Sequence, residues 1–139
     1  MSFLLDTNVV SEWVKPQPNP GVIAWLADAD EDRIFLSVVT LTELRYGVER
    51  MASGSRKRKL DQWLGEELPL RFEGRILDID PAVANTWGKL VARSEAIGDR
   101  IELMDAFIAA TAENYSLTVV TGNTSHFETL VRNVLNPWS

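Results

Sequence analysis

The fold is decided by the stretch Phe3-Leu4-Leu5-Asp6-Thr7-Asn8, in which a short apolar run meets an acidic residue and the start of a helix. Three apolar residues in succession, at 3–5, are typical of a strand that is buried on both faces. Asp6 follows this strand directly, and residues 7–15 are predicted to be helical until two prolines stop the helix. A buried strand that leads into a helix favours a parallel sheet, whose ligand site lies beyond the carboxyl ends of its strands.

The same alternation of short apolar strands and helices continues along the chain. The further strands are predicted at 34–37, 75–79 and 117–120, with a short edge strand at 134–135. The further helices are predicted at 20–28, 40–51, 56–68 (ended by Pro69) and 82–96, with a buried apolar helix that Asp105 opens. The sequence therefore predicts one α/β domain over residues 1–139, with three layers, in which helices flank a central, mainly parallel sheet of four to five short strands.

Composition excludes several classes of protein. The chain has 139 residues, no cysteine and one histidine, which rules out disulfides, thiolate metal sites and cysteine nucleophiles. Its net charge of −6 argues against a protein that coats nucleic acid through bulk electrostatics, but not against an enzyme that holds one phosphate through a bridging metal ion. No apolar stretch approaches the roughly 20 residues of a membrane span, and no signal peptide is evident. We therefore expect a cytoplasmic protein with no membrane association.

Four polar side chains follow the predicted strands at the end where a ligand site is expected. Asp6 follows the first strand, Glu43 lies on the helix after the second, and Asp105 opens the helix that leads to the fourth. Asn123 follows the fourth strand. All four can converge at one end of the sheet.

Each of these residues also has a purely structural interpretation. Asp6 and Asp105 could be helix N-caps, and Asn123 could be an ordinary turn residue. Residues 40–43, Thr-Leu-Thr-Glu, match a capping box in which the Glu43 side chain would bond back to the Thr40 amide.

Taken together, the three acids indicate a metal site. Each is flanked by apolar residues that direct it toward the interior, and none has a lysine or arginine beside it, apart from Arg45 and Arg100 if these fold back. Buried carboxylates without a cation are costly. Oxygen-rich clusters suit hard divalent cations, Mg²⁺ above all, and such ions activate water for phosphodiester hydrolysis.

Several motifs in this order resemble the PIN-domain family, and the closing residues Asn136-Pro137-Trp138 resemble the FitB-like branch of its VapC toxins. The motifs are Leu4-Leu5-Asp6-Thr7-Asn8, Thr42-Glu43-Leu44-Arg45-Tyr46-Gly47, Asp105-Ala106-Phe107-Ile108-Ala109-Ala110-Thr111-Ala112 and Leu117-Thr118-Val119-Val120-Thr121. The resemblance spans the whole chain. It implies a Mg²⁺- or Mn²⁺-dependent endoribonuclease that acts as the toxin of a VapBC-type toxin–antitoxin pair, with a small VapB-like antitoxin and RNA as partners. It also implies a homodimer and no direct DNA binding without the antitoxin.

The resemblance also implies roles for particular residues. The family's three acidic metal-site positions fall on Asp6, Glu43 and Asp105. Its fourth acidic position falls on Asn123, which can bind a metal-bound water through its carbonyl but brings no charge and therefore disfavours a second tightly held ion. Relatives often carry arginine in place of Gly122, and glycine there is expected to weaken substrate contact or loosen the loop. Asn8 and Thr121 are expected to orient the carboxylates or waters.

Other features have weaker functional readings. The basic run Arg56, Lys57, Arg58 and Lys59 is a candidate RNA contact, although charge runs are more often solvated helix faces. His126 reads as an ordinary loop histidine rather than a catalytic base. Trp13, Trp25 and Trp63 lie on apolar helix faces and are expected in the core, or, if exposed together, in a groove for an antitoxin helix.

Two other functions stay open at this point. A PIN-like binding module that has lost catalysis would act through antitoxin or nucleic acid, and Asn123 and Gly122 favour it. A Mg²⁺-dependent phosphatase or phosphoacceptor domain also uses an aspartate after a first strand. Such domains normally need a second acid beside that aspartate and a lysine late in the sheet, and the chain has no lysine after Lys89.

Overall fold

The computed structural model describes all of residues 1–139 and contains five strands and ten helical segments. In chain order they are β1 (Phe3–Leu5), α1 (Thr7–Glu12), α2 (Pro20–Asp28), η1 (Glu31–Arg33), β2 (Ile34–Ser37), α3 (Val38–Glu49), α4 (Ser55–Gln62), η2 (Trp63–Glu67), α5 (Leu68–Arg71), β3 (Ile76–Leu77), α6 (Pro81–Ala96), α7 (Leu103–Tyr115), β4 (Thr118–Val120), η3 (Thr124–His126) and β5 (Val134–Leu135). No helix combines the length and the apolar character that a membrane crossing requires.

The five strands form one parallel sheet in the order β3-β2-β1-β4-β5. The first strand is central because its run of apolar residues can be covered from both sides. Leu4 pairs with Val119 and Leu5 with Val120 in the register between β1 and β4. The predicted mainly parallel sheet is confirmed, with every pairing parallel.

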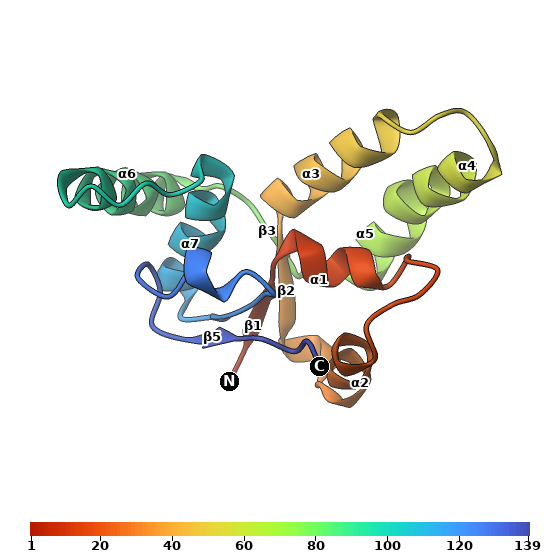
Figure 1. The fold of residues 1–139 in the computed structure, drawn as a ribbon, viewed down its shortest axis with the longest axis horizontal. Helices are drawn as coiled ribbons and strands as arrows, with labels where there is room; N and C mark the ends of the chain where they lie inside the picture. Colours follow the sequence, from red (N-terminus) through yellow and green to blue (C-terminus); the bar gives the residue numbers. More distant parts are fainter.

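Helices cover both faces of the sheet, so the predicted three layers are also confirmed. Figure 1 shows α6 and α7 on one side of the strands and the helices α1 to α5 on the other. Consecutive residues of a strand point to opposite faces. Accordingly, Leu4 packs in one core cluster with α6 and α7, while Leu5 packs in the other with α1, α2 and α3.

Most helix starts agree with the sequence pattern. Asn19 caps α2 through its side chain, and Asp80 caps α6, whose first residue is Pro81. The middle of helix α7 is buried, at Ala106 and at residues 108–112, as its apolar residues predicted, whereas its two ends are exposed. Trp13, Trp25 and Trp63 are partly buried against the core, which confirms the core reading of these side chains.

Other boundaries differ from the expectation. The first helix ends at Glu12 rather than 15, and β3 covers only residues 76–77 of the expected 75–79. Pro69 does not end its helix, which continues to Arg71. Immediately before Pro69 the chain makes a wider π turn, in which the Leu68 N–H reaches back five residues to the Trp63 carbonyl. Such a bulge lets the helix pass a residue that has no N–H to donate.

Candidate metal and active site

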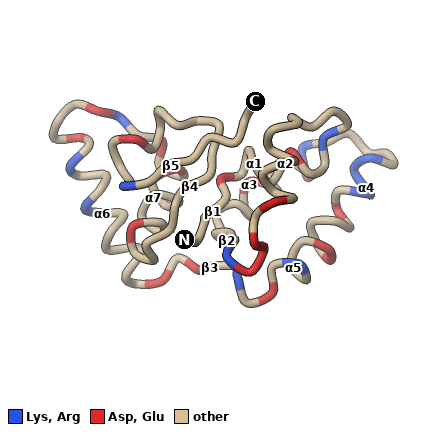
Figure 2. Tube along the Cα trace, turned by 90° about the horizontal axis from the view of Figure 1, so that it is seen from below, with Lys and Arg blue, Asp and Glu red and all other residues tan.

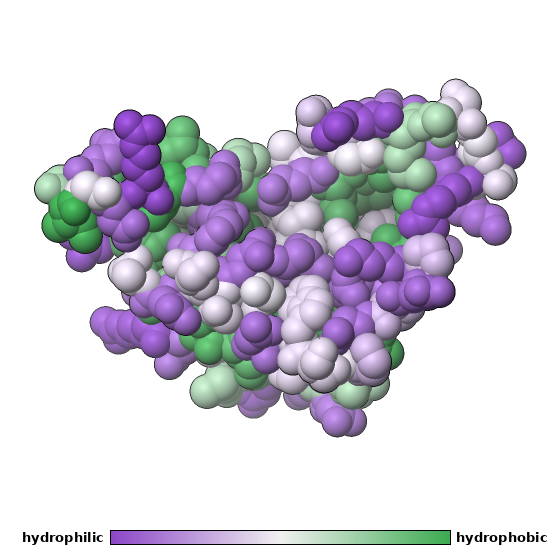
Figure 3. Space-filling view, in the orientation of Figure 1, coloured by the Kyte–Doolittle hydropathy of each residue, from purple (hydrophilic) through white to green (hydrophobic).

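The carboxyl ends of the central strands bring the predicted acids to one region. Asp6 follows β1, Thr121 follows β4, Glu43 lies on the second turn of α3 after β2, and Asp105 lies in the first turn of α7. The starts of α3 and α7 face each other across these strand ends in Figure 1. The space-filling view shows a hollow between the two groups of helices at this edge of the sheet (Figure 3).

Asp6 is the most enclosed of the three acids, with 4% of its surface exposed. Its Oδ1 accepts a hydrogen bond of 2.8 Å from the Thr7 backbone N–H, so the expected helix cap exists. Its Oδ2 accepts a second hydrogen bond of 2.8 Å from the hydroxyl of Thr121, which lies 115 residues later in the chain. Capping therefore does not account for the whole of this side chain.

Thr121 is the centre of a small polar network beside Asp6. Its hydroxyl oxygen accepts from Asn8 Nδ2 at 3.4 Å and from the Asn123 backbone N–H at 2.9 Å while it donates to Asp6. The Gly122 N–H in turn donates to Asn8 Oδ1 at 3.4 Å. The structure thus brings both predicted supporting residues, Asn8 and Thr121, to Asp6.

Glu43 does not form the capping box that its sequence context suggested. Helix α3 begins at Val38, two residues before Thr40, and its cap is Ser37, whose Oγ accepts from the Val39 N–H at 3.0 Å. The capping box was wrong because Thr40 already lies inside the helix. Glu43 Oε1 instead accepts a hydrogen bond of 2.6 Å from the Thr7 hydroxyl, which joins α3 to the start of α1.

Asp105 is not a helix cap either. The cap of α7 is Glu102, whose Oε2 accepts from the Asp105 N–H at 2.9 Å. The Asp105 side chain is therefore free of a capping role, and its Oδ2 lies 2.9 Å from His126 Nδ1. His126, expected to be an ordinary loop residue, belongs to the surroundings of the acids.

Burial and the neighbouring acids make the ionised form of each of the three carboxylates less favourable. Burial raises the pKa of Asp6 above its ordinary value, and the neighbouring charge of Asp105 raises it further. Burial likewise raises the pKa of Glu43, with added repulsion from Asp6 and Glu102. The pKa of Asp105 is raised by burial and by Glu102 and Glu43, although the His126 hydrogen bond opposes this. The mutual effects indicate that the three carboxylates share one electrostatic environment.

No lysine or arginine neutralises this environment. Arg45, which could have folded back toward Glu43, pairs with Glu49 and Asp61 instead. The one basic side chain that contacts an acid of the group is His126. Oxygen donors without a cationic partner fit a hard divalent cation. The side chains are not already gathered around a common point, however, because no three acidic or histidine groups meet in metal-binding geometry.

Two other predicted site features, Asn123 and the basic run Arg56 to Lys59, have surroundings that differ from those of the three acids. Asn123 is exposed and leads into η3 without using its side chain as a cap. The run from Arg56 to Lys59 is on α4, which starts at the outer edge of the molecule, whereas β1 lies at the centre (Figure 2). Arg56 and Lys57 donate to the backbone carbonyls of Val14 and Glu49. The structure does not bring this run to the carboxylates.

Sequence reasoning missed three contributors to the site. Thr7 binds Glu43, buried Thr40 lies 3.2 Å from the Thr7 hydroxyl, and His126 contacts Asp105. Thr7 could have been found from its place directly after Asp6, at the same strand end. His126 gave no comparable signal, because 21 residues separate it from Asp105.

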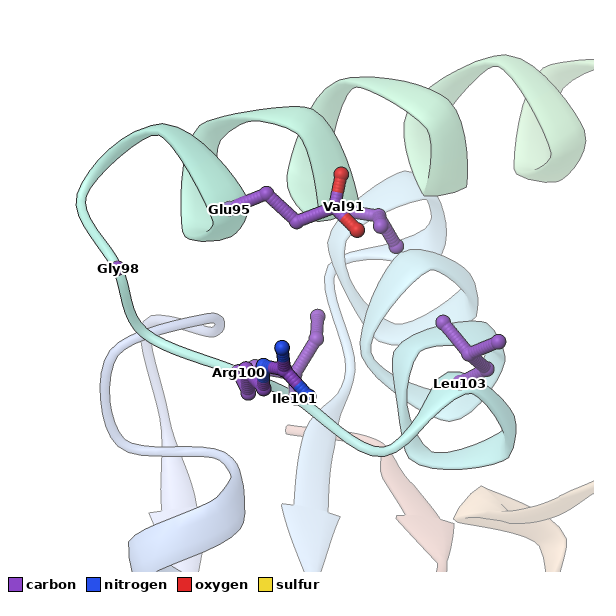
Figure 4. A pocket seen from close by; sticks show the side chains of 6 residues that line it. All are labelled: Val91, Glu95, Gly98, Arg100, Ile101 and Leu103. Atoms are coloured by element: carbon purple, nitrogen blue, oxygen red, sulfur yellow. The ribbon is translucent and has the colours of Figure 1, made fainter.

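A separate pocket lies between the end of α6 and the segment that leads to α7. It measures about 650 Å³ and is lined by Val91, Glu95, Gly98, Arg100, Ile101 and Leu103 (Figure 4). None of the three acids lines it. The size of a hollow therefore does not identify the chemistry in this molecule.

Comparison with known proteins agrees with this geometry. The model of the PIN-domain family matches residues 3–131. The protein named Toxin FitB of Neisseria gonorrhoeae is 41% identical over 136 residues, which cover 98% of each chain. The protein named VapC ribonuclease Y4jK of Sinorhizobium fredii is 37% identical over 98% of this chain and 97% of its own. A solved structure of FitAB bound to a DNA fragment has a TM-score of 0.92 and 38% identity, over 99% of this chain and 96% of that one.

Proposed function

The chain belongs to the PIN-domain family, and on this premise we propose that it is an endoribonuclease that acts as the toxin of a toxin–antitoxin pair. Two relatives that match almost its entire length carry the names toxin and ribonuclease. The observation that carries the proposal is the group of three acids without a cationic partner at the carboxyl ends of β1 and β4. A phosphodiester hydrolase that works through a divalent cation needs such a group.

Asp6, Glu43 and Asp105 would hold the cation, which we propose to be Mg²⁺ or Mn²⁺. Glu43 and Asp105 are less buried than Asp6, and each binds a neighbour on another element, so modest side-chain rotations could bring them toward Asp6. When bound, the ion would lower the pKa of a water molecule and offset negative charge on the phosphate. Asn123 would contribute through water alone.

The remaining residues of the site would orient the acids. Thr121 holds Asp6 Oδ2, and Asn8 in turn holds Thr121. Thr7 fixes Glu43 through its hydroxyl, and His126 fixes Asp105. Hydrogen bonds of this kind limit the movement of the acids, so that only modest rotations separate them from the geometry in which they would bind the ion.

We further propose that the partners are a small antitoxin and an RNA substrate, and that the protein acts in the cytoplasm. The FitAB structure, a complex with DNA, supports the antitoxin. We propose no direct DNA binding without the antitoxin; the net charge of −6 argues only against holding nucleic acid through bulk electrostatics. A homodimer and an RNA contact at Arg56 to Lys59 stay predictions, which light scattering and charge-reversal variants would test.

The test is incubation of the purified protein with total cellular RNA in Mg²⁺ or Mn²⁺, beside a sample with EDTA and beside Asp6→Asn. We expect discrete fragments that require the metal and are absent in the variant. Asp28→Asn, which changes an exposed aspartate on α2, is the matched control and should cleave like the wild type. Equal cleavage by Asp6→Asn and wild type would contradict the assigned site. Intact RNA in every sample would instead favour a binding module that has lost catalysis.

A further inference from the structure

Residues 136–139, which follow β5, form a tail that crosses to the start of α2 (Figure 1). Ser139 donates its N–H to Asn19 Oδ1 at 3.2 Å, and its Oγ accepts from the Gly21 N–H at 3.1 Å. A Cβ atom on Gly21 would lie 2.5 Å from the Pro137 carbonyl oxygen, so this approach needs a glycine. The tail is therefore fixed at one end by the first turn of α2.

Within the tail, Trp138 covers the backbone of Gly122. A Cβ atom on Gly122 would lie 3.0 Å from both Cε3 and Cζ3 of the indole ring. Trp138 also packs, partly buried, against the core cluster that contains Leu5 and Val120. The ring thus rests on the loop after β4 and on the core beneath it. The absence of a side chain at Gly122 admits the ring.

The covered loop is the one that supports Asp6. Gly122 lies between Thr121, whose hydroxyl donates to Asp6, and Asn123, whose N–H donates to that same hydroxyl oxygen. The Gly122 N–H also donates to Asn8. A shift of the Gly122 backbone would disturb each of these contacts.

We propose that Trp138 is a positioning residue for the carboxylate site, acting through Gly122 on the Thr121–Asp6 hydrogen bond. This inference rests on the proposed function, since it gives the tail a role in holding the acids that bind the cation. The hydrogen bonds of the tail go to Asn19, Gly21 and Asn136 and not to the acids, so we expect its influence on cation binding to pass through the loop after β4.

The first experiment compares Trp138→Ala, Trp138→Phe and the control Trp25→Ala. Trp25 is also partly buried in the same core cluster, where it packs on the edge of Phe3 at 5.0 Å between ring centres. Mn²⁺ affinity is measured by calorimetry without RNA, and kcat and KM with RNA. We expect Trp138→Ala to lose about tenfold or more in Mn²⁺ affinity and in kcat, in the range typical of residues that orient metal ligands. Phenylalanine should restore most of both, and Trp25→Ala should lower only the melting temperature.

A second experiment tests whether the effect passes through Gly122. Gly122→Ala places a methyl group where the ring lies and should also weaken Mn²⁺ binding. In the double variant Gly122→Ala/Trp138→Ala the methyl group has room, so the loss should be no larger than in Trp138→Ala alone. Such non-additivity is the signature of two residues that act through one contact.

Two results would overturn the proposal while leaving the proposed function intact. One is that the wild type binds Mn²⁺ and cleaves RNA, and a folded Trp138→Ala variant does both equally well. The other is full additivity in the double variant. If the wild type itself bound no Mn²⁺ and cleaved no RNA, the proposed function would fail, and the tail would have no site to position.

Discussion

Helix α1 has one buried carboxylate at each end, and only one of the two is paired with a cation. Glu12, at the end of the helix and 2% exposed, pairs with Lys15 and accepts the Asn19 N–H at 2.7 Å. These contacts hold the pKa of Glu12 below its ordinary value, although burial opposes them. Asp6, at the start of the helix and 4% exposed, has no cation, and burial raises its pKa.

The difference separates an acid that stabilises the fold from one that is available for chemistry. Glu12 receives its compensating charge from Lys15, which follows shortly after α1, so the folded chain itself balances the charge of this acid. Asp6 receives hydrogen bonds but no charge, so the folded protein keeps an unfavourable group at this point. Residues of this kind are expected at functional sites, where stability is given up for activity.

The largest expected contrast is in RNA cleavage. Asp6→Asn should lower kcat by more than about a hundredfold, because several kcal/mol of transition-state stabilisation depend on the ion that Asp6 binds. Glu12→Gln, which removes the same unit of charge about two helical turns away, should leave kcat within about threefold of wild type. Cleavage of total RNA in Mn²⁺ measures both. Similar losses in both variants would break the distinction between the two acids.

The second contrast is in stability. Glu12→Ala should lower the free energy of unfolding by about 2 kcal/mol, because it leaves the Asn19 N–H without its charged acceptor. The exposed partner Lys15 adds little, since surface ion pairs contribute weakly. Urea unfolding measures the change. Glu12→Gln keeps an acceptor and should lose less; an equal loss would show that the charge, not the hydrogen bond, matters.

Asp6→Asn should act in the opposite direction when no metal is present. In EDTA we expect the variant to be more stable than wild type by about 1 kcal/mol, a typical gain when a residue that serves function at the expense of stability is replaced. Asparagine can accept from only one of the two donors, the Thr7 N–H or the Thr121 hydroxyl, but it removes a charge that the fold disfavours, and we expect this second effect to be the larger. Thermal unfolding in EDTA checks this, and a lower melting temperature would contradict it.

The smallest contrast is in the pH dependence of stability. The pKa of Glu12 is lower in the folded state than its ordinary value of 4.5. The unfolded chain therefore takes up the proton first as the pH falls. The stability that ionised Glu12 provides should be complete above about pH 4.5 and should disappear as the pH falls through the folded-state pKa. Urea unfolding of wild type and Glu12→Gln at pH 7, 4.5 and 3.5 should show a shrinking difference, and a constant difference would refute this.

Several features of the fold follow directly from local sequence. Residues 3–5 and 117–120 could be placed in central strands, because uninterrupted apolar runs can only be satisfied by burial on both faces. The caps at Asn19 and Asp80 could be placed because a side-chain oxygen before a proline predicts a helix start. The three acids could be grouped because the carboxyl ends of parallel strands meet at one edge.

The predicted helix boundaries were wrong where the same short sequence pattern is compatible with two structures. Thr40 to Glu43 matched a capping box, yet α3 starts at Val38, since the Ser37 hydroxyl follows the buried strand more closely. Pro69 usually ends a helix, but a π turn before it let the chain continue. In both cases the packing of neighbouring elements decided between local alternatives.

The sequence by itself determined the parallel α/β architecture and the identity of the three acids, because strand burial and strand-end position are properties of short segments. Only the tertiary structure decided what surrounds those acids. Thr121 contacts Asp6 across 115 residues, and Thr7 contacts Glu43 across 36. Trp138, which follows β5, packs on Gly122, which follows β4. Such contacts are fixed by how the layers pack, and no periodicity within one segment encodes them.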